Sequence, residues 1–245
     1  MDVIESRLKQ RGVRLKRFDL PLQAAEHLAV AVADRLSTTM AERGQASLAL
    51  SGGRSPVRFL DALARQAIDW SRVRLTLVDE RWVPESDAQS NTALLRSRLA
   101  AIFPRLQWLP LYRGVTPAAD AAQVARQLAD WLPLDLVVLG MGVDGHTASL
   151  FPHAEGLTGW LDGNCDAGCV ASRAADGTPR LTLTGRALHS ARFRLLAISG
   201  DTKLRTLCTA IEADQPARWP ISAFVQAPMD IYYCPEDGQP DDAPV

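Results

Sequence analysis

Four short segments of the chain are almost wholly apolar, and they constrain the fold more than any other feature of the sequence. They read SLAL at 47–50, LTLV at 75–78, DLVVL at 135–139 and RLLAI at 194–198. A strand that is apolar along its whole length, instead of at alternate positions, is typical of a parallel sheet covered on both faces. We therefore expect a sheet of this kind at the centre of the molecule.

Segments with helical character separate these strands. The helices expected from apolar periodicity and from proline or serine at their starts span residues 22–43, a stretch after Pro56, a stretch from Asn91 behind a Ser90 cap, 117–131 and 201–212. Further strands are expected at 13–18, 108–112, 180–184 and 229–234. Strands that alternate with helices indicate βαβ units. The sequence predicts an α/β fold with a mostly parallel, doubly wound sheet and helices on both faces.

The 245 residues suffice for one domain with a large core. No internal repeat or linker interrupts the pattern, so we expect a single domain over residues 1–234. Residues 235–245 are acidic and rich in proline, which predicts a disordered tail. No predicted helix has a second long apolar face beyond the one needed to pack on the sheet, so a monomer is the expected state.

Charge and composition argue against several classes of protein. The formal net charge is −1, so the chain lacks the overall field of a nucleic-acid or membrane-surface binder. No apolar run approaches the roughly 20 residues of a membrane span, and the polar N-terminus resembles no secretion signal. Four cysteines predict reduced thiols in a cytoplasmic protein; the alternative, a structural metal near Cys165 and Cys169, is weak because the pair is not tightly spaced.

The first motif that could bind a ligand follows the strand at 47–50. It comprises Ser51, Gly52, Gly53, Arg54 and Ser55, and a helix is expected directly after it. Glycine lets backbone N–H groups approach a ligand closely, and a helix N-terminus attracts anions, so this turn suits a phosphate group. It matches neither a Walker A loop nor a nucleophile elbow. The alternative is a tight turn in which Ser55 caps the helix.

The second motif places Asp79, Glu80 and Arg81 at the end of the strand at 75–78. Three charges at the end of a buried strand are costly unless they are paired or used. Asp79 is a candidate for substrate contact and Arg81 for holding an anion, with Asn91 a further candidate lining residue. The alternative is a cluster of surface salt bridges.

The third and strongest motif is the loop GMGVDGHTASLFP at 140–152, which leaves the buried strand at 135–139. It presents Asp144 and His146 among Gly140, Gly142 and Gly145. Histidine is the usual acid–base group at neutral pH, and a nearby carboxylate can fix its tautomer. The loop also matches G-x-G-x-x-G, but the acidic residue expected about 20 positions later in a dinucleotide-binding fold is missing.

The fourth motif, SGDTK at 199–203, follows the strand at 194–198 and starts a helix. Lys203 in the first turn opposes the usual preference for acids there, which makes sense if an anion binds at the same helix end. The alternative is a solvated lysine.

Together these segments resemble the 6-phosphogluconolactonase family, whose relatives include glucosamine-6-phosphate deaminases. The matching stretches are SGGRSP, VDERWVP with Ser90 and Asn91, GMGVDGHTASLFP, RLTLT at 180–184 and ISGDTK, in the family's order over residues 45–205. Deaminase relatives have D-E-Y and D-G-H-I-A-F-N-E-P in the second and third stretches. Here Arg81 replaces that tyrosine, and Ser149, Leu150 and Phe151 replace the stretch that carries the deaminase acid.

The resemblance implies a NagB/RpiA/CoA-transferase-like fold and a sugar-phosphate lactone as substrate. It implies His146 as general base, Arg81 as oxyanion stabiliser and Asp144 as the group that orients the histidine. The expected substrate contacts are Ser51, Gly52, Gly53, Arg54, Ser55, Asp79, Asn91, Gly142, Gly145 and Lys203, with no metal or organic cofactor. Rival interpretations are an isomerase or deaminase of this fold, a sugar-phosphate sensor without catalysis and a dinucleotide-dependent oxidoreductase.

Overall fold

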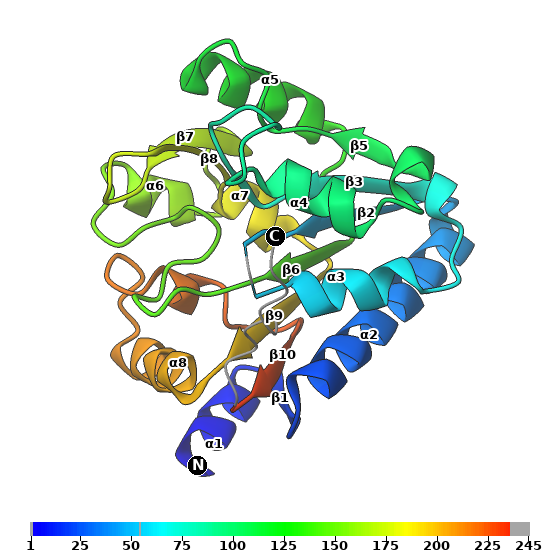
Figure 1. The fold of residues 1–245 in the computed structure, drawn as a ribbon. Coiled ribbons are helices and arrows are strands. Elements are labelled where there is room, and N and C mark those ends of the chain that lie inside the picture. Colours follow the sequence, from blue (N-terminus) through cyan, green and yellow to red (C-terminus); the bar gives the residue numbers. More distant parts are fainter. Residues whose placement is uncertain (1, 54, 236–245) are drawn as a thin grey trace.

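The fold is built on a seven-stranded sheet in which every neighbouring pair of strands is parallel (Figure 1). A computed structural model describes residues 2–53 and 55–235 of the chain. The order of strands is β1-β10-β9-β6-β2-β3-β5. Their bounds are β1 Val13–Arg17, β2 Ala46–Leu50, β3 Val73–Leu77, β5 Gln107–Leu109, β6 Leu136–Leu139, β9 Phe193–Ser199 and β10 Met229–Cys234.

The direction of winding changes between β2 and β6. From β2 the chain adds β3 and β5 on one side, and it then returns to place β6, β9 and β10 on the other. Leu48 of β2 is level with Leu75 of β3 and with Leu136 of β6. In sheets of this type a crevice opens beyond the carboxyl ends of the strands at the switch point, because the two flanking connections run to opposite faces. The predicted motifs after β2 and β6 are therefore adjacent.

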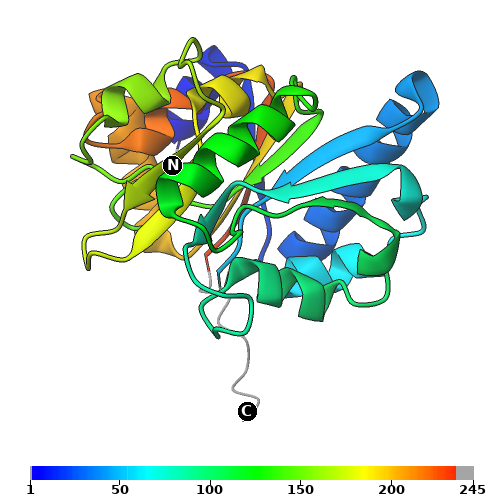
Figure 2. The same ribbon diagram turned by 90° about the horizontal axis from the view of Figure 1, so that it is seen from above.

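Helices cover both faces of the sheet (Figure 2). Their bounds are α1 Asp2–Gln10, α2 Pro21–Arg43, α3 Val57–Ala64, α4 Asn91–Arg98, α5 Pro117–Ala129, α6 Leu157–Leu161, α7 Gly185–Ser190 and α8 Asp201–Ala213, with short 3-10 turns at Trp70–Arg72, Phe103–Arg105 and Pro220–Ala223. On one face α2 packs on β2, β6 and β10 and continues into α3 and α4, whereas α1 and α8 lie against β1 and β9 on the other.

A second, three-stranded antiparallel sheet stands beside the main one. It contains β4 Asp79–Arg81, β8 Pro179–Leu183 and β7 Cys169–Arg173, in the order β4-β8-β7. Helix α5 packs against β7 and β8. Because β4 follows β3 after a single residue, the chain passes directly from the large sheet into the small one.

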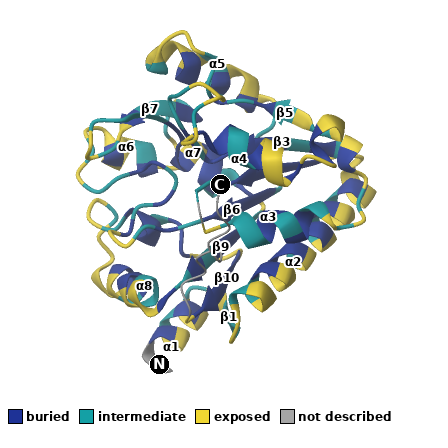
Figure 3. Ribbon diagram, in the orientation of Figure 1, coloured by how far each residue is buried: buried dark blue, intermediate teal, exposed yellow. Residues whose placement is uncertain are grey.

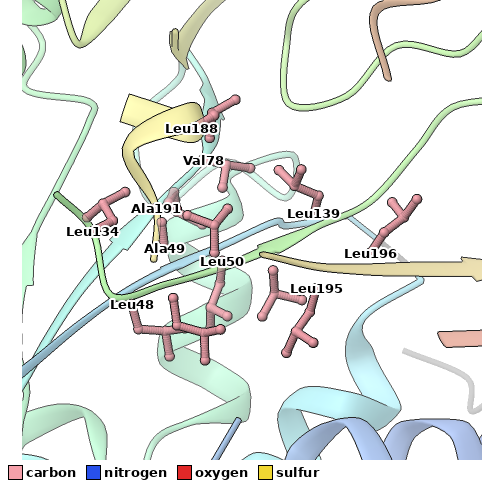
Figure 4. Close-up of a cluster of buried hydrophobic side chains, with 14 of the residues drawn as sticks. Leu48, Ala49, Leu50, Val78, Leu134, Leu139, Leu188, Ala191, Leu195 and Leu196 are labelled. Atoms are coloured by element: carbon pink, nitrogen blue, oxygen red, sulfur yellow. The ribbon is translucent and has the colours of Figure 1, made fainter. Parts of the chain in front are cut away.

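The core lies between the sheet and both helix layers (Figure 3). All five residues of β2 are buried, and leucines of β2, β6 and β9 point to both faces of the sheet (Figure 4). Removing this much apolar surface from water is the main stabilising term of such a fold. The apolar runs therefore form the central strands, as the sequence predicts.

The predicted α/β class and most of the predicted elements are confirmed. The strand at 229–234 matches β10, and Ser90 accepts a hydrogen bond from the N–H of Ala93 as the cap of α4. The strand expected at 108–112 is shorter, and α1, α6, α7, β4, β7 and the antiparallel sheet were not predicted from the sequence. The predicted disordered tail at 235–245 falls, from residue 236 on, outside the described residues. Within the described part of the chain, no helix is long and apolar enough to cross a membrane.

Candidate functional site

A cavity of about 280 Å³ opens at the carboxyl ends of β2, β6 and β9. Helices α2 and α3 contribute apolar side chains to one wall, including those of Leu28 and Phe59. Most of the residues singled out from the sequence line this cavity. They are Ser51, Gly52, Gly53, Ser55, Asp79, Arg81, Asn91, Gly142, His146 and Lys203.

The turn after β2 forms the floor of the cavity. The Ser51 hydroxyl donates to the carbonyl of Val138 and accepts from the N–H of Gly140, both at 3.0 Å, so its proton already serves to join β2 to the loop after β6. A β-carbon at Gly52 would overlap the side chain of Asn91, which explains the need for glycine there.

The other residues of this turn have different surroundings. Gly53 has φ +91°, and its N–H donates to Asn91 Oδ1 at 3.2 Å. Ser55 is exposed at the rim, and Pro56, not Ser55, occupies the cap position of α3, which has no side-chain cap. Arg54 is outside the described residues.

Glu80 organises the second motif from inside the protein. Its side chain is completely buried, so a cluster of surface salt bridges is not what this motif forms. Its carboxylate accepts hydrogen bonds from the N–H groups of Arg81, Asn91 and Thr92, and from the Thr92 hydroxyl, all at 2.8 Å. Burial raises the pKa of Glu80, and these hydrogen bonds to the ionised form oppose that shift. Glu80 thus ties β4 to the N-terminus of α4.

This attachment brings Arg81 and Asn91 together at the cavity. Asn91 is buried; its Oδ1 accepts from Arg81 Nη1, and its Nδ2 donates to the Asp79 carbonyl at 2.9 Å. Across the antiparallel pair, Arg81 lies directly opposite Arg180. Burial, and after it the positive charge of Arg81, lowers the pKa of Arg180. Two guanidinium groups therefore lie close together beside the cavity, and one of them, that of Arg81, lines it.

The loop after β6 places a histidine–carboxylate pair at the cavity. His146 Nδ1 lies 2.5 Å from Asp144 Oδ1, and the imidazole packs on the Phe151 ring with centroids 4.8 Å apart. Burial acts to raise the pKa of Asp144. The hydrogen bond and the charge of His146 lower the same pKa by more, so the pKa of Asp144 is lowered overall. Asp144 does not itself line the cavity; it holds the ring that does. This arrangement leaves Nε2 of His146 for acid–base work.

Glycines in this loop serve the histidine pair. A β-carbon at Gly142 would overlap both the His146 imidazole and the Asp144 carboxylate. The N–H of Gly142 donates to the His146 carbonyl at 2.9 Å, and the N–H of Gly145 donates to the Gly142 carbonyl at 3.0 Å. Neither N–H points to a ligand, and the structure places Gly145 outside the cavity, against Trp219. No helix begins directly after this loop, whereas a dinucleotide-binding fingerprint leads straight into one, so the match to G-x-G-x-x-G has no structural counterpart here.

Lys203 lines the cavity from the first turn of α8, half-buried instead of fully solvated. Asp201 in the same turn accepts a hydrogen bond of 2.5 Å from the Tyr233 hydroxyl, which ties α8 to β10. Burial, and after it this bond to Asp201, raises the pKa of Tyr233 to about 12. The start of α8 is thereby fixed relative to the sheet.

Two lining or supporting residues were missed by the sequence analysis. Arg58 reaches the cavity from α3, and Ser149 donates a hydrogen bond of 2.5 Å to Asp79 Oδ2. A cation two positions after the predicted helix start could have identified Arg58, whereas no local signal pairs Ser149 with Asp79. Among the described residues, no group of three or more histidine, cysteine or acidic side chains is arranged to hold a metal, and Cys165 and Cys169 form no disulfide with each other.

Comparison with known proteins places these features in context. Residues 21–232 match the model of the family described as glucosamine-6-phosphate isomerases/6-phosphogluconolactonase. The chain is 43% identical to a 6-phosphogluconolactonase of Pseudomonas aeruginosa over 91% of its own length and 96% of that protein, and 40% identical to one of Pseudomonas putida over 92% and 99%. Among solved structures, a 6-phosphogluconolactonase from Shewanella baltica superposes with a TM-score of 0.85 at 34% identity, covering 91% of this chain and 97% of that one.

Proposed function

The chain belongs to the family of glucosamine-6-phosphate isomerases and 6-phosphogluconolactonases, and on this premise we propose that it hydrolyses 6-phosphoglucono-δ-lactone to 6-phosphogluconate. This reaction is the second step of the oxidative pentose phosphate pathway. The observation that carries the proposal is one cavity lined by His146, Arg81, Asn91 and Lys203, with Asp144 holding the His146 ring from outside the cavity. These groups match the needs of acyl transfer from a phosphorylated sugar lactone to water.

Hydrolysis requires a base for water, a stabiliser for the oxyanion and an acid for the leaving ring oxygen. In the proposed mechanism, His146 removes a proton from water as the water oxygen attacks the lactone carbonyl. The C–O bond of the ring then breaks, and the protonated imidazole returns the proton to the ring oxygen. Asp144 accepts from Nδ1, which keeps Nε2 as the acid–base atom and stabilises the charged ring.

Arg81 is the proposed stabiliser of the oxyanion. The N–H groups of Gly142 and Gly145 already donate within their loop, so a guanidinium is the better candidate. Asn91 accepts from that guanidinium, and Glu80 holds both residues through the backbone. Asp79 is proposed to accept hydrogen bonds from sugar hydroxyls. The remaining proposed substrate contacts are Ser51, Gly52, Gly53, Arg54, Ser55 and Lys203.

Two features favour the lactonase over the isomerase or deaminase alternative. The two Pseudomonas relatives, at 43% and 40% identity, are named 6-phosphogluconolactonases and match over more than nine-tenths of the chain. Beside the cavity, the buried hydroxyl of Ser149 donates a hydrogen bond to Asp79, and Ser149 lies in the segment where the deaminase relatives carry an additional acid. An amine-releasing isomerisation would lack that acid here.

Hydrolysis of freshly generated 6-phosphoglucono-δ-lactone, followed by proton release against an enzyme-free blank, tests this function. We expect acceleration by the wild-type protein and a loss of about 10²- to 10⁴-fold in His146→Ala, the usual contribution of general acid–base catalysis. His27→Ala, which removes an exposed histidine of α2, is the matched control. Release of ammonia from glucosamine 6-phosphate, with no lactonase activity over the blank, would contradict the proposal.

We further propose that the protein works as a monomer in the cytoplasm. Only five large apolar side chains are exposed on the described surface, and they come from α2 with its cap and from two separate loops: Leu20, Leu22, Val30, Val115 and Val143. A dispersed set of this kind is ordinary for a monomer. Light scattering coupled to gel filtration tests the proposed state, and a mass of two or more chains at micromolar concentration would overturn it.

A further inference from the structure

We propose that Arg58 binds the phosphate group of the substrate together with Lys203 and makes the enzyme selective for phosphorylated lactones. This inference rests on the proposed function and adds a specificity residue to it. Arg58 lies in the first turn of α3, directly behind the turn of Gly52 and Gly53, and its side chain lines the same cavity as Lys203.

The position of Arg58 is unfavourable for a cation unless an anion binds nearby. The N-terminus of a helix carries a partial positive charge, so a cation in the first turn is repelled by the helix end. Helix α3 has no acidic residue in that turn and no side chain that caps its free N–H groups. A phosphate in front of this helix would interact favourably with the helix end and with the arginine.

The surroundings of Arg58 supply no such anion. Its side chain is half-buried, and within the described part of the chain it makes no hydrogen bond, ion pair or ring contact. Other arginines in the neighbourhood are paired: Arg96 with Glu85 at 2.5 Å, and Arg98 with Asp61 of α3 at 3.6 Å. Partial loss of water around an unpaired guanidinium is costly, and an anionic ligand would offset that cost.

Lys203 approaches the same cavity from the other side of the sheet. It lies in the first turn of α8, and α3 and α8 lie on opposite faces of the sheet (Figure 2). Two helix N-termini, each with a cation in its first turn, thus reach one cavity from two sides. A phosphate between them would accept from both cations, which a neutral hydroxymethyl group could not do.

The charge of the whole lining agrees with this assignment. Its described residues include three cations, Arg58, Arg81 and Lys203, and a single carboxylate, Asp79, which Ser149 already hydrogen-bonds. Arg81 is bound to Asn91 at the β4 side of the cavity, so it serves the reacting carbonyl in the proposed mechanism. Of the other two cations, Arg58 has no partner among the described residues, and in this proposal it binds the doubly charged end of the substrate together with Lys203.

Selectivity measured on Arg58→Ala tests the proposal. The measured quantity is the ratio of kcat/KM for 6-phosphoglucono-δ-lactone to that for the unphosphorylated glucono-δ-lactone. We expect this ratio to fall about 10- to 100-fold, mainly through KM for the phosphorylated substrate, which is the usual worth of a charged hydrogen bond. Arg58→Lys should recover part of the loss. Arg65→Ala removes an exposed cation from the end of the same helix and should leave the ratio unchanged.

Calorimetric titration with 6-phosphogluconate separates failure of this proposal from failure of the proposed function. Binding is read without turnover, so it tests Arg58 even if the wild-type protein hydrolyses neither lactone. We expect Kd to rise about 10- to 100-fold in Arg58→Ala, and gluconate to bind weakly to wild type and variant alike. An unchanged Kd for 6-phosphogluconate, in a variant that unfolds at the wild-type temperature, would overturn the role of Arg58.

Discussion

The Oγ of Ser149 lies 2.5 Å from Oδ2 of Asp79 and donates a hydrogen bond to it. The two residues come from different motifs, 70 positions apart in the chain. Ser149 is buried in the loop after β6, and Asp79 starts β4 at the rim of the cavity. The bond fixes one oxygen of a carboxylate that is proposed to accept hydrogen bonds from the sugar.

Removal of this bond should impair the enzyme without unfolding it. In Ser149→Ala the Asp79 carboxylate loses a partner in a partly buried site, and we expect kcat/KM for the phosphorylated lactone to fall about 10-fold, as for other hydrogen bonds to charged groups. Ser190→Ala, which removes a hydroxyl bonded to the Ala187 carbonyl in α7, is the control. Wild-type kinetics in Ser149→Ala would show that the position of Asp79 does not depend on this bond.

Gly142 should be intolerant of any side chain. A β-carbon at this position would overlap the ring of His146 and the carboxylate of Asp144, so Gly142→Ala must displace the pair. Displacements of about 1 Å in a catalytic group can cost about 10²-fold in rate, and we expect a loss of kcat of that order. Gly159→Ala, in α6, has open space around the new methyl group and should keep wild-type kinetics. Equal activity of the two variants would contradict the placement of His146.

Glu80 should contribute to the stability of the fold. Its carboxylate accepts from buried N–H groups of Asn91 and Thr92, and in Glu80→Gln an amide NH₂ would face one of these donors. We expect the free energy of unfolding to fall by about 1–3 kcal/mol, measured by denaturant titration. Glu85→Gln breaks an exposed pair with Arg96 and should change it by at most about 1 kcal/mol. Equal losses in both variants would show that burial of Glu80 adds nothing.

His189 should make the stability of the protein depend on pH. Burial lowers its pKa below the ordinary value of about 6.5, against the opposing effect of its bond of 3.0 Å to the Leu161 carbonyl. The folded state then binds a proton less readily than the unfolded state. Its contribution to stability is complete above about pH 6.5 and is lost as pH falls from there through the folded pKa.

A glutamine at position 189 isolates this effect. Its Nε2 can donate to the Leu161 carbonyl but does not titrate. We expect the difference in unfolding free energy between pH 7.5 and pH 5.5 to be smaller in His189→Gln than in the wild type. His27→Gln, on the exposed side of α2, should keep the wild-type difference. Identical pH dependence in all three proteins would refute the role of His189.

Local patterns predicted the elements that carry the site. The apolar run of β6 and the glycines after it were enough to predict a loop with Asp144 and His146 at the carboxyl end of a strand, and Ser90 was enough to predict the start of α4. By contrast, β4 was missed, because the three charged residues Asp79–Arg81 have no apolar alternation. Its strand conformation comes from pairing with β8, about 100 residues later.

The sequence by itself determined the central strands and the edge of the sheet at which the candidate site lies. The reason is that each buried strand is a short apolar run, and the residues at its carboxyl end are simply those that follow it in the chain. The sequence did not determine which polar groups meet there. The contact of Ser149 with Asp79 and the pairing of Arg81 with Arg180 join segments remote in sequence, and the burial of Glu80 against α4 is not visible in its own segment. Contacts of this kind depend on how loops pack above the sheet, so only the tertiary structure decided them.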